Sequence, residues 1–246
     1  MIRQLRSEIA KVTTTKTLVG MLAALAGLVA LAVAVHVYAL PMDTIATRTG
    51  QRELLTEVGV NLGGLFAALI GALSITTEYR TGTIRPTLLA APWRRKVLAA
   101  KALTAFATGA VAALVATGTA SLTAAVALRF RDLSTMPTTG DYVDLLAGGA
   151  VGGGLLGVLG LAVGAIVRAQ VPTFVILFSW LLFIENVLAE LPDAHRFVPG
   201  ALAQGLAALD REGIVQTVWL SGLLLTAYAC AALAVSVSAF NRRDVV

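Results

Sequence analysis

The sequence has little of what catalysis and water-exposed surfaces need. Among its 246 residues there are one cysteine and two histidines, and only 13% are charged, against roughly 25% in soluble proteins. A single cysteine, Cys230, excludes a disulfide within the chain. With His36 and His195 it forms no recognisable metal-binding spacing. The scarcity of charge excludes an ordinary soluble domain, and nucleic acid is not an expected partner.

The common catalytic motifs are missing as well. The sequence has no G-x-x-x-x-G-K-[ST] phosphate loop, no H-E-x-x-H zinc motif and no G-x-S-x-G serine motif. We therefore expect no catalytic or metal site, no cofactor bound by this chain, and no enzyme activity from the chain by itself. An ion-coupled transporter normally carries several ionisable residues inside the membrane, and Glu185 is the one carboxylate that we expect at that depth.

Long hydrophobic runs dominate instead. Hydrophobic residues make up 57% of the chain and its mean hydropathy is +0.83. A helix that spans a membrane needs about 20 apolar residues. Five uncharged runs have that order of length, and a sixth reaches it if it continues past Glu185 to about Leu191. The sequence therefore predicts an all-α membrane protein with six transmembrane helices. The runs are Leu18–Leu40, Val58–Thr77, Ala102–Leu128, Leu145–Val167, Val171–Ile184 and Gly213–Phe240.

The positive charges predict the orientation. If the N-terminus is inside, 13 of the 19 Lys and Arg residues lie in inner segments and six in outer ones. Cytoplasmic loops carry such an excess, so we expect both termini in the cytoplasm and the chain in the cytoplasmic membrane. The first hydrophobic run is too long for the core of a cleavable signal peptide. The segments Pro41–Glu57 and Phe130–Asp144 are expected to be plain outer loops.

Two segments outside the spans have patterns of their own. Residues 1–16 predict an amphipathic helix at the inner interface, the alternative being a basic tail that only sets topology. Residues 185–212 predict one or two short helices that form a re-entrant or lid-like segment, the alternative being a surface loop. Glu185 either faces protein or water there, as a candidate outer gate, or extends to the outer interface.

The fourth span is rich in glycines spaced four residues apart. Small residues at this spacing let helices approach closely in lipid. The pattern is compatible with a mobile or subunit-facing helix and equally with tight packing inside one subunit. A six-span unit with so many small residues leaves little room for a path, so we expect any transport path at a homodimer interface. Aromatic and polar residues on the second and fifth spans are its candidate lining, although plain helix packing explains them nearly as well: Asn61, Phe66, Phe174, Phe178 and Trp180.

Residues 78–101 form a basic loop between the second and third spans. The loop holds six of the 19 Lys and Arg residues and one acid, Glu78. Gly82 allows a sharp turn, and Pro86 suits the first turn of a short helix. Apolar side chains that can enter a groove follow at Ile84, Leu88 and Leu89. We interpret the loop as a docking element, the alternative being a charged turn that only sets topology.

This loop also carries a resemblance to a known family. The order Glu78-x-Arg80-x-Gly82-Thr83-Ile84, then Thr87-Leu88-Leu89 and Pro92-x-Arg94-Arg95, is similar to that of the permease subunit of ABC-2 type ABC transporters. The segment 1–16 resembles the elbow helix of that family, and residues 185–199 resemble its outer re-entrant helices. The resemblance extends over essentially the whole chain and implies a single permease domain, 1–246.

The resemblance implies a function and partners. It implies the translocating subunit of an ATP-driven exporter of hydrophobic or amphipathic substrates, working as a homodimer. Because no ATPase domain is recognisable here, two copies of a separate ABC ATPase subunit are expected, which bind ATP and Mg and receive a coupling helix at about Gly82–Ala91. The alternatives are a non-transporting membrane anchor or sensor, and an ATP-independent channel or carrier. The residues expected to dock or couple are Glu78, Arg80, Gly82, Thr83, Ile84, Leu88, Arg94 and Arg95.

Overall fold

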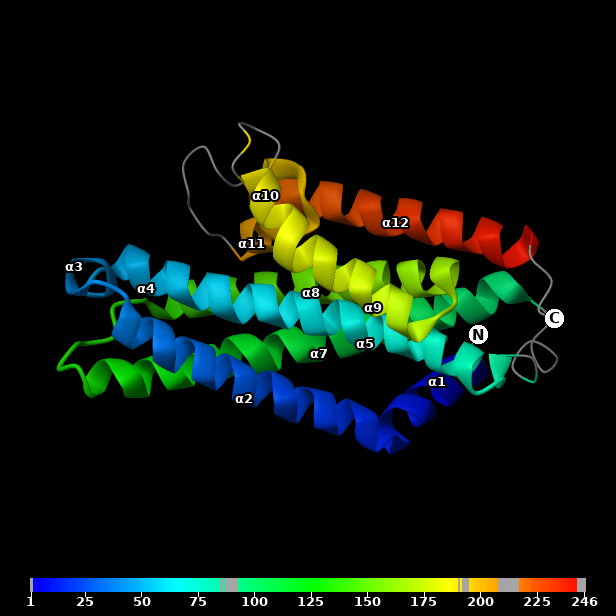
Figure 1. Ribbon diagram of the computed structural model, residues 1–246, viewed down its shortest axis with the longest axis horizontal. Coiled ribbons are helices and arrows are strands. Elements are labelled where there is room, and N and C mark those ends of the chain that lie inside the picture. Colours follow the sequence, from blue (N-terminus) through cyan, green and yellow to red (C-terminus); the bar gives the residue numbers. More distant parts are fainter. Residues whose placement is uncertain are drawn as a thin grey trace.

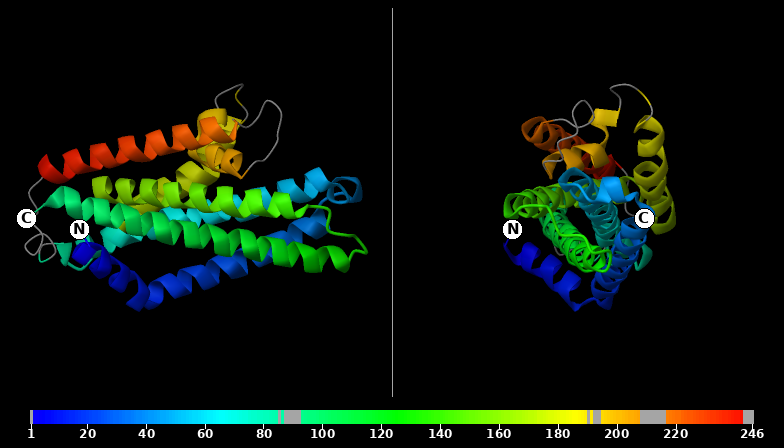
Figure 2. Two further views of the ribbon diagram at one scale, coloured as in Figure 1. Left: turned by 180° about the vertical axis from the view of Figure 1, so that it is seen from behind. Right: turned by 90° about the vertical axis from the view of Figure 1, so that its left-hand side faces the viewer.

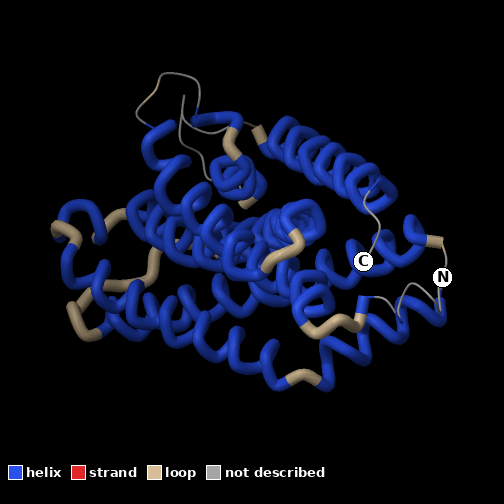
Figure 3. The backbone as a smooth tube through the Cα atoms, turned by 45° about the vertical axis from the view of Figure 1, so that its right-hand side comes forward, coloured by secondary structure: helices blue, strands red, loops and turns tan. Residues whose placement is uncertain are grey.

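The computed structural model describes residues 2–84, 86, 93–189, 191, 195–207 and 217–242. Within these ranges the chain is helical and contains no strand (Figure 3). The elements are α1 (Ile2–Thr14), α2 (Lys16–Ala39), α3 (Met42–Ile45), α4 (Arg48–Leu54), η1 (Leu55–Val60), α5 (Asn61–Arg80), α7 (Arg94–Arg129), α8 (Thr139–Val167), α9 (Gln170–Phe178), η2 (Ser179–Ile184), α10 (Glu185–Ala189), η3 (His195–Phe197), α11 (Pro199–Leu206) and α12 (Val218–Arg242).

The six predicted spans are confirmed as helices. In the described part of the chain, six helices are long and apolar enough to cross a membrane. The protein is therefore a multi-pass, all-α membrane protein. The helices are Lys16–Ala39, Arg48–Arg80, Arg95–Arg129, Thr139–Val167, Gln170–Leu188 and Val218–Ala239.

Helices α5, α7 and α8 form the centre of the bundle. They make the most extensive contacts with one another, while α2 packs on α7, α9 on α5 and α12 on α8 (Figure 2). In the most apolar stretch of the α5 span 72% of the residues are buried, against 11% for the α9 span and 22% for α12. The outer helices therefore leave most of their surface for lipid or another protein.

The central place of α8 follows from its glycines. A Cβ atom on Gly160 would lie 1.9 Å from the carbonyl oxygen of Ala68 in α5. On the facing helix, a Cβ atom on Gly71 would lie 1.9 Å from the oxygen of Gly157. Backbones this close exclude any side chain at the contact, as in other small-residue packing between membrane helices. Of the two interpretations of the glycine pattern, the structure shows tight packing inside one subunit.

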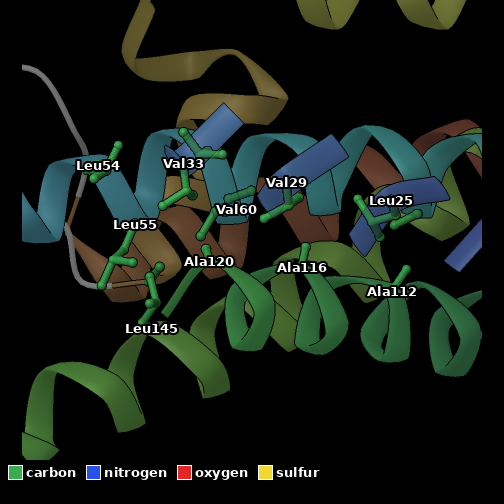
Figure 4. Packing of buried hydrophobic residues seen from close by; sticks show 14 of the residues in the cluster. Leu25, Val29, Val33, Leu54, Leu55, Val60, Ala112, Ala116, Ala120 and Leu145 are labelled. Carbon is green, nitrogen blue, oxygen red and sulfur yellow. The ribbon is translucent and has the colours of Figure 1, made fainter. Parts of the chain in front are cut away.

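Helix α2 packs on α7 through large side chains set against small ones. Leu25, Val29 and Val33 are four residues apart and fully buried. They face Ala112 and Ala116 of α7, which are also four residues apart (Figure 4). Rows at this spacing interdigitate between helices, so a narrow stripe of α2 is buried although most of the helix surface is not.

The expectation of a plain loop at Pro41–Glu57 was wrong. Helices α3 and α4 occupy this segment, and α4 continues into α5 through the π-helical segment η1. The second span therefore begins at Arg48 and not near Val58. The prediction excluded the charged residues that precede Val58 from the span. In the structure, two of these residues, Arg48 and Arg52, form ion pairs with Asp141 of α8.

Both ends of the described chain lie at one end of the bundle. Helix α1 and the last turn of α12 lie there together with the end of α5 and the start of α7 (Figure 1). We call this the inner end, after the orientation that the positive charges predict. The turn between α7 and α8 lies at the opposite, outer end, and α10 and α11 lie short of it (Figure 1). An even number of spans explains why the two termini share one end.

We predict that Gly160→Ala destabilises the protein by about 1–3 kcal/mol, because the added methyl group forces α5 and α8 apart. Gly118→Ala in α7 is the matched control, since no atom lies within 4 Å of the Cβ position there. Thermal unfolding of the two variants in detergent checks this. Equal midpoints for both would contradict close packing of α8 on α5.

Candidate functional site at the inner end

A buried lysine organises the inner end of the bundle. Lys101 lies about two turns into α7, and its side chain is only 1% exposed. Its Nζ donates to Glu8 Oε2 at 2.7 Å, to Glu78 Oε1 at 2.8 Å and to the carbonyl oxygen of Ser74 at 3.1 Å. An ammonium group has three donors, so every one of them is used.

A second lysine completes the arrangement. Lys11 Nζ donates to Glu8 Oε1 at 2.8 Å and to Glu78 Oε1 at 2.7 Å. We call Glu8, Lys11, Glu78 and Lys101 the charge cluster. Its two carboxylates and two ammonium groups balance, and they come from α1, α5 and α7. The cluster therefore ties the first helix of the chain to the inner ends of the second and third spans.

The pairing sets the ionisation of the two groups on α1. Burial alone raises the pKa of Glu8, but Lys101 and Lys11 outweigh it and hold that pKa below the ordinary value. Burial lowers the pKa of Lys11, yet hydrogen bonds to Glu78 and Glu8 raise it above its ordinary value. Both shifts favour the charged forms. Glu8 and Lys11 are therefore both charged at neutral pH.

Helix α1 turns a polar face to the protein. Glu8 and Lys11 are three residues apart and share that face. On the other side, Ile9 is 46% exposed. The amphipathic helix expected from residues 1–16 is present as α1. Lys11 forms its ion pairs with two carboxylates of the protein, Glu8 and Glu78.

The motif that follows α5 forms an exposed and ordered turn. Arg80, Gly82 and Thr83 are exposed, and the hydroxyl oxygens of Thr81 and Thr83 lie 2.9 Å apart in a hydrogen bond. Gly82 has a φ of 71°, a conformation that glycine adopts without steric cost. The sharp turn expected at Gly82 is confirmed.

Two predicted docking residues point into the protein. Glu78 is buried in the charge cluster, where Lys11 and Lys101 are its partners. Ile84 is 3% exposed and packs in a cluster with Ile75 and Leu98. The structure thus corrects the expectation that Ile84 enters a groove of another protein, since this chain already buries it.

The rest of the basic loop is described only in part. Leu88 lies outside the described residues, as does most of the expected coupling helix. Arg94 begins α7, and Arg95 is exposed. Lys96 Nζ lies 4.5 Å from the ring centroid of Trp93, whose side chain is 67% exposed. The start of α7 therefore presents a basic and aromatic surface.

The candidate path residues divide into two groups. Phe66 and Phe174 are half-buried and pack against the cores around α5. Asn61, Phe178 and Trp180 are exposed, and Asn61 accepts a hydrogen bond from Gln204 of α11 at 2.8 Å. The predicted spans two and five are neighbours within one chain. Plain packing thus accounts for Phe66 and Phe174.

Glu185 faces protein. It is 9% exposed, and the Gly200 N–H lies 3.1 Å and 3.0 Å from its two carboxylate oxygens. Gly200 lies in the first turn of α11, where a carboxylate interacts favourably with the helix dipole. A Cβ atom on Gly200 would lie 2.1 Å from Glu185 Oε2, so a larger residue there would force the Glu185 carboxylate to shift. Glu185 therefore fastens α11, and the short helices expected in 185–212 are present as α10 and α11.

A second ion-pair group at the outer end was not predicted. Asp141 accepts hydrogen bonds at 2.9 Å from both Arg48 Nε and Arg48 Nη2 and forms an ion pair with Arg52 at 3.2 Å. A shallow recess lined by Leu55, Tyr142 and Leu145 lies beside it, with room for no more than about one water molecule. This group fastens α4 to α8. A signal was present in the sequence, since Thr138 and Asp141 have the spacing of a capping box.

No protein-family model matches this chain, and no curated protein matches it. The similarity to ABC-2 permeases is therefore an expectation from the sequence motif.

We predict that Lys101→Met destabilises the protein by about 3 kcal/mol or more, because it leaves two buried carboxylates with one half-exposed lysine. The double variant Lys101→Met/Glu8→Gln keeps the Lys11–Glu78 pair and should recover part of this loss. Lys16→Met, at an exposed position, is the control and should change stability by less than about 0.5 kcal/mol. Denaturant titration in detergent measures all three. A wild-type midpoint for Lys101→Met would contradict the central role of the cluster.

The cluster also predicts how stability depends on pH. The pKa of Glu8 is lowered on folding from an ordinary 4.5, so its contribution is present above that value and is lost as pH falls through the folded pKa. The pKa of Lys11 is raised from 10.5, so its contribution is lost as pH rises through the folded pKa.

On the acidic side, Glu8→Gln should therefore weaken the dependence of the unfolding midpoint on pH, measured from neutral pH downward. Asp43→Asn, at an exposed position outside the spans, should leave it unchanged. An acid slope in Glu8→Gln as steep as in the wild type would show that Glu8 does not ionise in this way.

Proposed function

We propose that this chain is the membrane-spanning translocation subunit of an ATP-driven exporter of the ABC-2 type, in the cytoplasmic membrane with both termini inside. A separate ABC ATPase subunit, in two copies, binds ATP and Mg and docks on the inner end. The substrate is hydrophobic or amphipathic. The chain itself performs no hydrolysis.

The observation that carries the proposal is the attachment of the docking motif to the bundle. The exposed turn at Arg80–Thr83 begins two residues after Glu78, which the charge cluster connects to α1 and α7. A loop that only set topology has no need of a rigid connection to two further helices. A loop that transmits force from a partner does need such a connection. If the loop moved independently of the helices, binding of the partner would not displace them.

The exposed groups at the inner end favour an acidic partner surface. Arg80 is exposed at the end of α5, and Arg95 and Lys96 are exposed at the start of α7, where Trp93 lies beside Lys96. Complementary charge increases the rate and specificity of docking more than its affinity. The partner therefore presents carboxylates around the groove that receives the loop.

Helix α1 serves as the interfacial elbow. Its polar face is occupied by the charge cluster, and Ile9 on the other side is exposed. An exposed apolar face beside the first span lies favourably in the headgroup region of the inner leaflet. Binding to lipid and binding to α7 then use opposite faces of the same helix.

The path belongs to a homodimer interface on the side of α9. Helix α5 is mostly buried within its own subunit, whereas α9 and η2 expose Phe178 and Trp180. Two copies that meet near this face would place aromatic side chains along a shared path. Asn61, held by Gln204, lies toward its outer part. An apolar lining of this kind suits a lipophilic substrate. The α10–α11 segment, fastened by Glu185, acts as the outer lid.

The test is the ATPase activity of the complex purified through this chain from its native membranes in mild detergent. The wild-type eluate should contain two copies of this chain, two copies of an ABC ATPase subunit and vanadate-sensitive ATP hydrolysis. The double variant Arg80→Glu/Arg95→Glu should lower that co-purified activity by about tenfold or more, since both changes oppose the acidic surface. Arg129→Glu, an exposed charge reversal at the outer end, should leave the activity unchanged.

Four outcomes would contradict the proposal or a part of it. An eluate without an ABC ATPase would exclude the class, and equal effects of inner and outer reversals would exclude docking at the loop. A tightly bound ATPase that candidate lipophilic substrates never stimulate, with no flux in vesicles, would indicate a membrane anchor. A single copy of this chain per complex would reject the homodimer path.

A further inference from the structure

Arg168 occupies the tight inner turn between α8 and α9. Its φ is 63°, in the left-handed region, and its N–H donates to the carbonyl oxygen of Gly164 at 2.9 Å. Glycine is the usual residue at such a helix end. An arginine in this conformation is unfavourable for the backbone.

The side chain joins two other helices. Its guanidinium group lies 5.5 Å from the ring centroid of Tyr79, in the last turn of α5. Its Nη2 donates to the carbonyl oxygen of Ala239 at 2.9 Å. Ala239 belongs to the last turn of α12, whose carbonyl groups lack partners within the helix. A cation at a helix C-terminus is also favourable for the dipole.

The position of Tyr79 makes this contact informative. It follows Glu78 directly, and successive residues of a helix point about 100° apart. Glu78 therefore connects the last turn of α5 to α1 and α7, while Tyr79 connects the same turn to α12. The turn that carries both residues leads straight into the exposed motif at Arg80–Thr83.

The other end of α12 is held by a different element. Leu206 of α11 lies 3.3 Å from the Cβ position of Gly222, and α11 packs against both α12 and α8. Helix α12 is otherwise little buried. It packs along α8, and it has a further contact with Arg168 at the inner end and with α11, which Glu185 fastens, toward the outer end.

We propose that Arg168 is a positioning residue that makes α12 follow the last turn of α5. When that turn moves, the Tyr79–Arg168–Ala239 link carries the inner end of α12 with it, and the helix pivots about its contact with α11. The inference rests on the proposed function only for the source of the movement, which is the docked ATPase. The link itself is a property of this chain alone.

The experiment measures distances between spin labels in the full chain, without ATPase, in lipid nanodiscs and with Cys230→Ser as background. One label pair at positions 80 and 238 reports the distance from the end of α5 to α12. A second pair at positions 7 and 99 reports the distance from α1 to α7. All four positions are exposed. Arg168→Gly is the main variant, because glycine keeps the left-handed turn and removes only the side chain.

In Arg168→Gly the width of the 80–238 distance distribution should increase roughly twofold, because the inner end of α12 then moves independently of α5. The width of the 7–99 distribution should not change. Tyr79→Leu should have the same effect, and the double variant should be no broader than either single one. Tyr79→Phe keeps the ring and should match the wild type. Glu8→Gln should broaden the 7–99 distribution alone.

An unchanged 80–238 distribution in Arg168→Gly would overturn the link and leave the proposed function intact. Broadening of both pairs would also overturn it, because that indicates general loosening. If the distances behave as expected but no ABC ATPase is found with the wild type, the link stands and the proposed function fails.

Discussion

The burial of the Lys101 ammonium group is the constraint on which the inner end of this protein depends. An ammonium group removed from water is stable only when carboxylates and hydrogen-bond acceptors surround it. Here the carboxylates come from two different helices, Glu8 of α1 and Glu78 of α5. Helix α1 is thereby held on α7 by charge, and the last turn of α5 has a fixed position before the exposed motif begins.

Elsewhere the bundle is held by close approach of small residues. Lipid is as apolar as the helices, so helix association inside a membrane depends on packing and hydrogen bonds. Gly157 and Gly160 of α8 supply that packing against α5. The result is a tight centre of α5, α7 and α8, with α2, α9 and α12 around it. The loosely packed outer helices have the most freedom to move, and Arg168 joins one of them, α12, to the last turn of α5.

The sequence anticipated elements more reliably than contacts. Six spans, a first helix with two faces and short helices after Glu185 all follow from periodicity and hydropathy. The predicted start of the second span is too late, because charged residues such as Arg48 and Arg52 are typical of loops. The sequence does not show that Asp141 neutralises both of them. Ile84 was predicted to enter a groove of a partner because periodicity does not distinguish burial within the chain from burial against another protein. Nothing in the sequence spacing puts Arg168 beside Tyr79 or Ala239, because these three residues come from different helices.

By itself the sequence determined the class of the protein, the number of its spans and the expected direction of its charged ends. These properties depend on composition and local periodicity. Exposing polar backbone groups to lipid is costly, and a helix avoids that cost because it pairs these groups within the same segment. Only the tertiary structure decided which charges neutralise one another. Glu8 and Lys101 are 93 residues apart in the chain, and a pairing over that separation exists only when α1, α5 and α7 are brought together. This pairing joins the two ends of the basic loop, Glu78 and Lys101, to each other and to α1.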